Sequence, residues 1–424
     1  MHDFTETKEK SIAIAIGKKG ADRVIAFEHL NELEFLAETA GAEIIEKIYQ
    51  ELANPNRSTV IGTGKLEEIK LIIEEKGITL IIFDDDISPM QLRNLEKALQ
   101  IKVVDRSGLI LDIFAKHARS QEAKVQVELA QSQYLLPRLT KMWTHLSKQY
   151  GGIRTKGPGE TQIETDRRML KIKIQKLKEK LEDISVQREQ QRKGRNEFTQ
   201  FALMGYTNAG KSTLMNAITD ADVYVEDKLF ATLDTTVRSF NLQGGAKALI
   251  SDTVGFIRKL PVNLIASFRT TLAEASEADI LIHVVDVSHN FFREHIKVVN
   301  ETLESLKISD KPVILVLNKV DLIEDVNDLR AIEFEYPHAV FTSASRNINI
   351  QKLMSVMQEK SEEQSKTLSL ILPYTAMDLV SEVYSNADII SRDDKDEGVH
   401  FNIRVKNDKL KLFEHNFRKY INIE

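Results

Sequence analysis

The strongest constraint on the fold is a glycine-rich segment near the middle of the 424-residue chain. Gly205, Gly210, Lys211 and Ser212 have the Gly-x-x-x-x-Gly-Lys-Ser spacing of a phosphate-binding loop, between a strand pattern and a helical pattern. The glycines let successive backbone N–H groups point at phosphate oxygens, and the helix N-terminus adds partial positive charge. The segment therefore predicts a nucleoside-triphosphate site in an α/β domain.

A second motif, Asp252-Thr253-Val254-Gly255, follows the apolar strand 247–251. The carboxyl ends of parallel strands meet at one edge of a sheet, so we expect this motif beside the phosphate-binding loop. Asp252 can hold Mg²⁺ through a water molecule, and the Gly255 N–H can bond the γ-phosphate. The loss of that phosphate would then be sensed at Gly255.

A third motif predicts which base is bound. Asn318-Lys319-Val320-Asp321 ends the strand 313–317, and the Asp321 carboxylate can accept from guanine N1–H and the 2-amino group. Adenine lacks that pair of donors, so ATP would leave the carboxylate unpaired and should be rejected. The segment 343–345, Ser-Ala-Ser, ends the last strand, where its backbone can read guanine O6.

Mg²⁺ is the predicted metal cofactor. Ser212 is one expected ligand, and a threonine between Ser212 and Asp252 is the other. Thr232 is favoured, Thr235 is second, and Thr236 is a further candidate.

The predicted GTP-binding residues come from five segments. They are Gly205, Tyr206, Thr207, Asn208, Ala209, Gly210, Lys211, Ser212, Thr213, Phe230, Ala231, Thr232, Leu233, Asp234, Asp252, Thr253, Val254, Gly255, Asn318, Lys319, Val320, Asp321, Ser343, Ala344 and Ser345.

No catalytic residue is assigned. Many GTP switches carry a water-orienting Gln after the Asp-x-x-Gly glycine, but Phe256 occupies that position here. Phenylalanine cannot orient or deprotonate water, so we predict slow hydrolysis by the protein alone. Asn208 suggests a compensating device, since its side-chain oxygen can help to seat K⁺ near the β/γ bridge.

The pattern of strands and helices predicts a multidomain α/β protein in four parts. Residues 1–117 form an N-terminal α/β domain, and residues 118–195 form an antiparallel helical hairpin with a Gly-rich tip. Residues 196–362 form the GTPase domain with a mainly parallel sheet, and residues 363–424 form a small α+β domain. The first hairpin helix is expected over 118–147 with a kink at Pro137.

Charge is distributed unevenly along the chain, whose net charge is −6. Residues 138–195 contain 16 Lys/Arg and 7 Asp/Glu, so this stretch carries +9. Positive charge gathered in one stretch of an acidic chain favours a polyanion partner for the hairpin. Two plainer interpretations stay open, namely a solvated helix rich in lysine and a simple spacer between domains.

Several classes of protein are excluded or disfavoured by composition. The chain has no cysteine, which rules out disulfides and cysteine-ligated metal sites. No apolar run approaches the roughly 18 residues needed to span a bilayer. The N-terminus lacks the pattern of a secretory signal. We expect a cytoplasmic monomer without a membrane span.

The motifs resemble those of the HflX family of bacterial GTPases over roughly residues 10–360. The resemblance rests on segment 230–234, Phe-Ala-Thr-Leu-Asp, on the motifs at 252–256 and 318–321, and on two upstream stretches, 104–114 and 157–168. It implies the four-part fold, binding to the large ribosomal subunit near the peptidyl-transferase region, and hydrolysis stimulated by the ribosome. It also implies splitting or rescue of stalled or idle ribosomes, notably under heat stress.

With that resemblance, the basic hairpin becomes the expected contact with rRNA. Arg154, Lys156, Arg167 and Arg168 would contact phosphates in a salt-sensitive manner. Some family members bind ATP through the N-terminal domain, but nothing in these residues predicts such a site. Two alternatives remain: a tRNA-modification or ribosome-assembly GTPase, and a non-hydrolysing GTP-binding scaffold.

Overall fold

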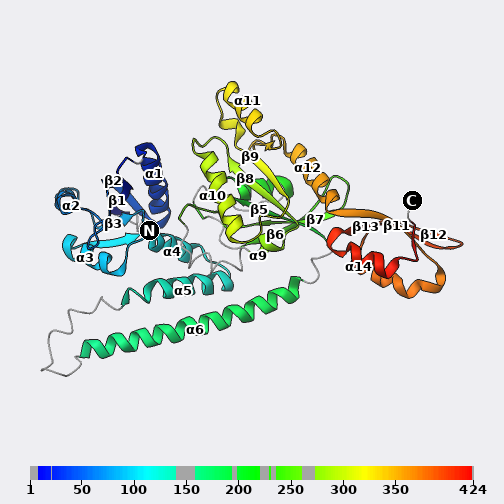
Figure 1. Cartoon of the computed structure of the whole chain (residues 1–424), viewed down its shortest axis with the longest axis horizontal. Coiled ribbons are helices and arrows are strands. Elements are labelled where there is room, and N and C mark those ends of the chain that lie inside the picture. The colour runs from blue at the N-terminus through cyan, green and yellow to red at the C-terminus, as the bar shows by residue number, and fades with distance from the viewer. Residues whose placement is uncertain are drawn as a thin grey trace, which may run out of the picture. The chain divides into compact units, whose positions relative to one another are not determined.

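The computed structural model describes residues 8–20, 22–139, 158–192, 198–219, 229–230, 235–259 and 273–422 (Figure 1). These residues form two compact units. The first contains 8–20, 22–139, 158–186, 229–230 and 258–259, and the second contains the rest. Within the described ranges, no helix is both long enough and apolar enough to cross a membrane.

The first unit is built on a four-stranded parallel sheet with the order β2-β1-β3-β4. Its elements are β1 (Glu9–Lys18), α1 (Arg23–Ala40), β2 (Ala42–Leu52), α2 (Thr63–Lys76), β3 (Leu80–Phe83), α3 (Pro89–Leu99) and β4 (Lys102–Asp105). All four residues of β3 are buried, as expected for a parallel strand covered on both faces. The predicted alternation of strands and helices is confirmed.

Asp105, at the end of β4, organises the transition to the helices that follow. Its carboxylate is fully buried and accepts from the Gly108 N–H at 2.8 Å, which caps α4 (Arg106–His117). It also accepts from the Tyr134 hydroxyl and from Arg138, each at 2.7 Å. Asp105 is therefore a buried charge with a full set of partners, as a buried carboxylate requires.

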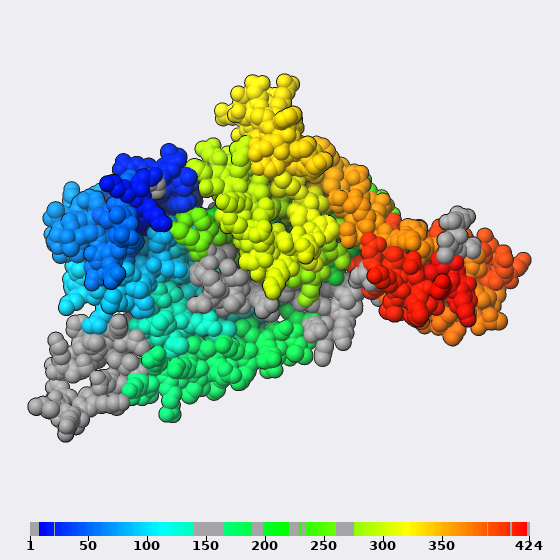
Figure 2. Space-filling model, viewed as in Figure 1, coloured from blue at the N-terminus to red at the C-terminus, as the bar shows by residue number. Residues whose placement is uncertain are grey.

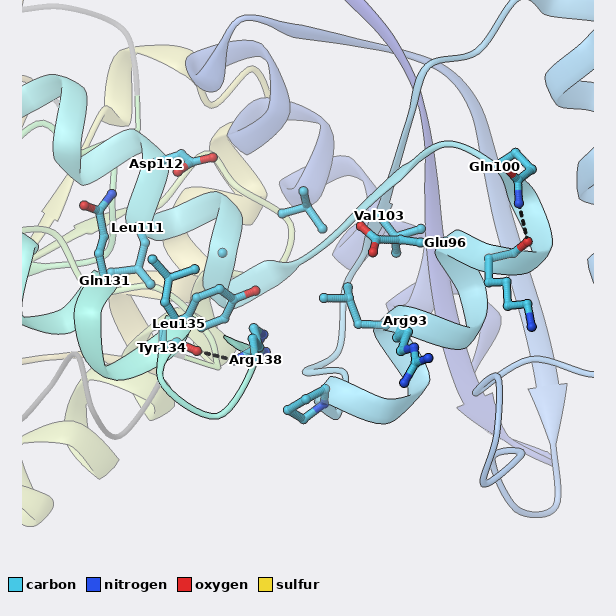
Figure 3. Close-up of a pocket in the computed structure, with 15 residues that line it drawn as sticks. Arg93, Glu96, Gln100, Val103, Leu111, Asp112, Gln131, Tyr134, Leu135 and Arg138 are labelled. Atoms are coloured by element: carbon cyan, nitrogen blue, oxygen red, sulfur yellow. Dashed lines mark hydrogen bonds between the residues drawn. The ribbon is translucent and has the colours of Figure 1, made fainter. Parts of the chain in front are cut away.

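A pocket of about 730 Å³ lies along the edge strand β4, between α3 on one side and α4 and α5 (Gln121–Leu135) on the other (Figure 3). Arg138 lies over the Tyr134 ring, with 3.4 Å between the guanidinium carbon and the ring centroid. Burial, followed by the nearby Asp105, raises the pKa of Tyr134. Tyr134 therefore stays protonated and donates to Asp105.

Helices α5 and α6 (Pro158–Arg192) lie side by side (Figure 1). Val125 and Leu129 of α5 pack against Leu177 of α6, and Glu128 pairs with Lys173 at 2.7 Å. Apolar side chains and an ion pair therefore join the two helices. The first helix differs from the prediction, because it ends at Leu135 instead of continuing through a kink at Pro137. Leu136 still has helical dihedral angles, but Pro137 has no backbone N–H and cannot continue the hydrogen-bond ladder of the helix.

The second unit contains a six-stranded sheet with the order β10-β9-β8-β5-β7-β6. All neighbours are parallel except β6 and β7. Its strands are β5 (Thr199–Gly205), β6 (Thr236–Asn241), β7 (Lys247–Asp252), β8 (Ile280–Asp286), β9 (Val313–Asn318) and β10 (Val340–Phe341). Its helices are α7 (Lys211–Thr219), α9 (Ala273–Glu277), α10 (Phe292–Ser305), η2 (Val320–Leu322), α11 (Val326–Glu335) and α12 (Ile350–Glu363).

The chain ends in a four-stranded antiparallel sheet with the order β12-β13-β11-β14. Its elements are β11 (Ser365–Leu372), η3 (Tyr374–Leu379), α13 (Val380–Asn386), β12 (Asp388–Lys395), β13 (Gly398–Lys406), α14 (Asn407–Phe417) and β14 (Ile421–Asn422). Alternate β13 residues, including Phe401 and Ile403, join Phe413 and Phe417 of α14 in one core. The fold class is therefore confirmed: a parallel GTPase-type sheet, further domains, and a small α+β domain.

Candidate functional site

The phosphate-binding loop connects β5 to α7, as predicted. Gly205 has φ +154, and a Cβ there would lie 2.1 Å from the Val284 carbonyl oxygen. Gly210 has φ +90, and its Cβ would lie 2.4 Å from the Asn318 side-chain nitrogen. Only glycine fits at these two positions, so close packing as well as phosphate access explains the motif.

Lys211 is buried under the loop, with 7% of its surface exposed. Its Nζ donates to the carbonyls of Gly205 at 3.2 Å and Tyr206 at 2.8 Å. Burial, partly offset by Asp252, lowers the pKa of Lys211 to about 8. Phosphate oxygens would supply the anionic partner that favours the charged ammonium.

Two histidines of this region were not predicted from the sequence. His283 of β8 is 2% exposed, and burial, followed by the charge of Lys211, lowers its pKa to about 4. His295 of α10 stacks on the ring of Tyr206, with 3.9 Å between centroids and 8° between planes. A histidine inside an apolar strand or an amphipathic helix carries no local signal of such contacts, so sequence patterns could not find them.

Ser212 and Asp252 are brought together at the head of α7 and the end of β7. The Ser212 hydroxyl donates to the Asp252 carboxylate at 2.5 Å, and Asp252 is 1% exposed. Hydroxyl and carboxylate oxygens are the donors that Mg²⁺ prefers, so the pair fits the predicted metal. Ser212 would ligate the ion, and Asp252 would hold one of its water molecules.

The segment after Asp252 packs directly on the phosphate-binding loop. A Cβ on Gly255 would lie 2.9 Å from Thr207 Cα and 3.1 Å from Lys211 Nζ. Phe256 donates its N–H to the Gly205 carbonyl at 3.0 Å and accepts from the Thr207 N–H at 2.8 Å. The Phe256 side chain is 2% exposed, so it lies in the core and does not line a water site.

Asn318 connects three parts of the predicted guanine site. Its side-chain nitrogen donates to the Ala209 carbonyl at 3.0 Å. Its oxygen accepts from the Ala344 N–H at 3.0 Å and the Thr342 hydroxyl at 3.3 Å. Asn318 is 1% exposed, so these bonds form in a dry environment. The residue thereby ties the phosphate-binding loop to the segments that would hold the base.

The base-reading residues follow Asn318. Lys319 has φ +65 and pairs with Asp286 at 2.8 Å, which turns the chain sharply after β9. The Asp321 carboxylate is largely buried and lies 3.8 Å from Arg346 Nε. The Ser343 hydroxyl bonds that of Ser345 at 3.3 Å and accepts from the Arg346 N–H. Arg346 was not predicted, because an arginine after a serine cluster is common on loops.

Other predicted site residues lie elsewhere or outside the described ranges. Residues 231–234, including Thr232, are outside them, as are Arg154 and Lys156. Phe230 belongs to the first unit, where its 2% exposed ring packs edge-on against Phe114 with 4.6 Å between centroids. Arg167 and Arg168 are exposed on α6, and Figure 2 shows one side of the coloured part of this helix at the surface.

Three protein-family models match consecutive parts of the chain. Residues 27–115 match the family described as GTP-binding GTPase N-terminal, and residues 117–195 match GTP-binding GTPase Middle Region. Residues 200–319 match the family described as 50S ribosome-binding GTPase.

Among curated proteins, GTPase HflX of Caldanaerobacter subterraneus is 42% identical over 407 residues, covering 96% of this chain and 93% of its own. GTPase HflX of Flavobacterium psychrophilum is 52% identical over 325 residues, covering 76% and 78%. The Escherichia coli protein of the same name is 43% identical, covering 82% of each chain. A solved SsGBP–GDP complex is 27% identical, covers 84% of this chain and 99% of its own, and has a TM-score of 0.48.

Proposed function

The chain belongs to the HflX family of GTPases and hydrolyses GTP, and we propose that it does so as a switch on the large ribosomal subunit, splitting or rescuing stalled or idle ribosomes under stress such as heat shock. The proposal rests on the combination of a guanine-nucleotide site with a basic helical surface. The match of residues 200–319 to a family described as 50S ribosome-binding GTPase supports the same partner.

The nucleotide chemistry follows from the residues around the phosphate-binding loop. Lys211 would bind the β- and γ-phosphates, and the Gly255 N–H would bond the γ-phosphate. Asp321 would pair with guanine. P-loop GTPases use Mg²⁺; Ser212 would hold the ion here, and its charge would offset negative charge on the phosphates.

Slow turnover in the free protein is part of the proposal. Phe256 is held in the core by its ring and by its backbone pairing with Gly205 and Thr207, so it has no access to an attacking water. A water-orienting group must then come from a partner or from a rearranged segment. The ribosome is the partner that we propose.

The proposed rRNA-binding surface is the described part of α6, which has nine Lys/Arg and seven Asp/Glu and therefore a net charge of +2; most of the +9 of residues 138–195 lies outside this helix. Exposed Lys and Arg side chains recur along this helix, and such repeated charges do not select a nucleotide sequence. They include Arg167, Arg168, Lys171, Lys176, Lys178 and Lys180. Contacts of this kind bind phosphates, with an affinity that falls as salt is raised. rRNA would thus be held by charge, while its shape supplies specificity.

The decisive experiment measures GTP hydrolysis by the purified protein alone, with large subunits and with small subunits. Strong stimulation by large subunits only is expected. Activation by dimerisation or K⁺ alone, without a ribosomal effect, would favour a tRNA-modification or assembly role. No turnover under any condition would contradict the hydrolytic switch. Splitting is tested separately, by following the light scattering of 70S particles after GTP and protein are added.

The hairpin assignment has its own test. Arg167→Glu with Arg168→Glu should weaken co-sedimentation with large subunits and leave GDP affinity unchanged, as should Arg154→Glu with Lys156→Glu. Arg330→Glu with Lys352→Glu is the matched control, because it changes the net charge equally at exposed positions of α11 and α12. Equal co-sedimentation of all these variants would remove the hairpin from the proposed interface.

We also propose that Asn208 helps to seat K⁺. Its backbone has φ +61, so the loop turns at this residue, and the residue is exposed beside the buried Lys211. Replacing K⁺ by Na⁺ should slow hydrolysis, and Asn208→Ser should remove that dependence. An equal rate of GTP hydrolysis in K⁺ and in Na⁺ would contradict the proposed K⁺ site.

A further inference from the structure

The chain segment that follows the γ-phosphate motif ends in a cluster of ionic groups. Arg258 and Lys259 belong to the first unit, whereas Gly255 and Phe256 belong to the second. Only Ile257 separates Phe256 from Arg258. Each residue spans at most about 3.6 Å, so the chain between Phe256 and Arg258 is short. A movement of Gly255 or Phe256 must therefore displace Arg258 or be taken up by the few rotatable bonds between them.

The cluster lies at the carboxyl end of β3, beside Ile14 of the neighbouring strand β1. Asp84 follows β3, and its backbone N–H bonds the Ile14 carbonyl of β1 at 2.9 Å. These two strands are neighbours in the sheet. The chain leaves β1 for β2 on one side of it and then crosses to β3 on the other side, so the strand order reverses at β1. A crevice forms at such a switch point in doubly wound sheets, and it is where ligands bind. Here two cations of the same chain, Arg258 and Lys259, contact the residue that follows β3.

Asp84 is the centre of the cluster, with a side chain that is 2% exposed. Arg106 donates to its Oδ1 at 2.7 Å, and Arg258 donates to both of its oxygens, at 3.2 and 3.0 Å. Lys259 Nζ lies 2.9 Å from Oδ2. Burial alone would raise the pKa of Asp84, but Arg106, Arg258 and Lys259 outweigh it and hold that pKa below its ordinary value. Asp84 is therefore ionised.

Charge balance explains why Arg258 and Lys259 are needed. Three carboxylates meet three cations in the cluster: Glu32, Asp84 and Asp85 with Arg106, Arg258 and Lys259. Without the segment 258–259, the 2% exposed Asp84 would lose two of the three cations that contact it among the described residues. Uncompensated buried charge is strongly unfavourable, so Asp84 favours the docked position of that segment.

The backbone of this segment is also fixed. The Arg258 carbonyl accepts from Arg106 Nε at 3.2 Å, and Lys259 has φ +54, a conformation that non-glycine residues rarely adopt. Backbone and side-chain contacts together thus define one docked position for Arg258. Arg106 donates to the Arg258 carbonyl and also to Asp84, the carboxylate that pairs with the Arg258 side chain.

In the docked arrangement, groups that GTP and Mg²⁺ would use are bonded within the chain. Thr207 donates its N–H to Phe256, Lys211 bonds loop carbonyls, and the Ser212 hydroxyl donates to Asp252. Binding of Mg²⁺ would require the Ser212 hydroxyl to exchange Asp252 for the ion. A bond from the Gly255 N–H to the γ-phosphate would move Gly255 and the paired Phe256, and this movement would pull on the segment leading to Arg258. GDP makes no such demand on Gly255.

We propose that Glu32, Asp84 and Asp85 are a docking site for Arg258 and Lys259, and that docking opposes GTP binding while leaving GDP binding almost unchanged. The N-terminal sheet thereby contributes positioning residues to the nucleotide switch. By reciprocity, GTP weakens the docking by the same factor by which docking weakens GTP. This inference depends on the GTPase activity and is independent of the ribosome as a partner.

The test uses the full-length protein and compares the Kd of fluorescent GDP with that of a non-hydrolysable GTP analogue in Mg²⁺. Arg258→Gln should lower the ratio of the analogue Kd to the GDP Kd about five- to tenfold, within the usual range for coupled sites. Asp84→Asn should do the same. The double variant should lower the ratio no further than either single variant, since one interaction is removed in all three.

Controls keep the test decisive. Arg293→Gln removes an exposed arginine that pairs with Glu335 at 2.5 Å, and it should leave the ratio unchanged. If Asp84→Asn fails to fold because Arg106 loses its partner, Lys259→Gln, Asp85→Asn and their combination form a second cycle at half-exposed positions. An unchanged or raised ratio in folded Arg258→Gln, or additive effects in the cycle, would overturn the proposal.

Discussion

Replacing Asn318 by alanine tests whether the nucleotide site is held together as the structure indicates. The side chain is 1% exposed and contacts three groups on different segments: the Ala209 carbonyl, the Ala344 N–H and the Thr342 hydroxyl. Alanine would leave all three without that partner. None of the three can reach bulk water without moving a strand end or the phosphate-binding loop.

The expected magnitude follows from those three bonds. A buried polar group that loses its partner costs about 1–3 kcal/mol, so three such groups cost about 3 kcal/mol at the least. Part of this free energy appears as reduced stability of the GTPase domain. The other part appears as weaker nucleotide binding, because the Ala209 carbonyl belongs to the phosphate-binding loop. A loss of about 3 kcal/mol in affinity alone would raise the Kd about 150-fold.

The assay pairs two measurements on the same preparation. Fluorescent-GDP titration gives the change in binding free energy, and urea unfolding followed by circular dichroism gives the change in stability. Their sum should reach about 3 kcal/mol for Asn318→Ala. Asn300→Ala, at an exposed position of α10, should change neither. A sum below about 1 kcal/mol would refute the view that Asn318 bears these three contacts in solution.

Three further predictions concern residues around the same loop. The neutral His283 imidazole, with its pKa lowered from 6.5 to about 4, stabilises the fold fully above pH 6.5 and progressively less as pH falls to 4. His283→Leu should therefore flatten urea-unfolding stability over that range by about 3 kcal/mol, and an unchanged pH profile would refute it. Gly255→Ala places a Cβ 2.9 Å from Thr207 Cα and 3.1 Å from Lys211 Nζ, so the phosphate-binding loop must shift and binding of both GDP and a GTP analogue should weaken about tenfold; unchanged affinity for both nucleotides would contradict this. Phe256→Gln buries an amide at a 2% exposed position, so single-turnover phosphate release should not accelerate, and a tenfold faster release would show that the side chain reaches the attacking water.

Local patterns predicted most of the fold because the deciding interactions are local. In the N-terminal domain, the strand Leu80–Phe83 is a buried apolar run and the helix Pro89–Leu99 begins at a capping serine, so each is determined within a few residues. The first hairpin helix was predicted too long. Pro137 interrupts the helix, and the bonds of Arg138 to Asp105 and the Ile87 carbonyl, which the sequence does not report, hold the chain after it in a turn.

Some residues of the nucleotide site could likewise be predicted from local patterns, and others could not. Gly205, Lys211, Ser212 and Asp252 could be brought together in advance, because strand order in a parallel sheet follows from the strand–helix alternation. The role of Asn318 as a three-way link could not be foreseen, since its partners lie 109, 24 and 26 residues away in the sequence. Nothing in the spacing of a motif reports hydrogen bonds of that range.

The ionic cluster around Asp84 shows where sequence reasoning stops and why this matters for the switch. Asp84 and Arg258 are separated by 174 residues, and each looks like an ordinary surface charge within its own segment. Burial makes the charge of Asp84 important, because a carboxylate that is 2% exposed needs cationic partners. Two of these cations, Arg258 and Lys259, follow the γ-phosphate motif by only a few residues. A GTPase domain with a complete set of motifs therefore does not by itself define the switch. The carboxylates that receive Arg258 and Lys259 come from a sheet without any nucleotide motif, and they add a second equilibrium that GTP must displace.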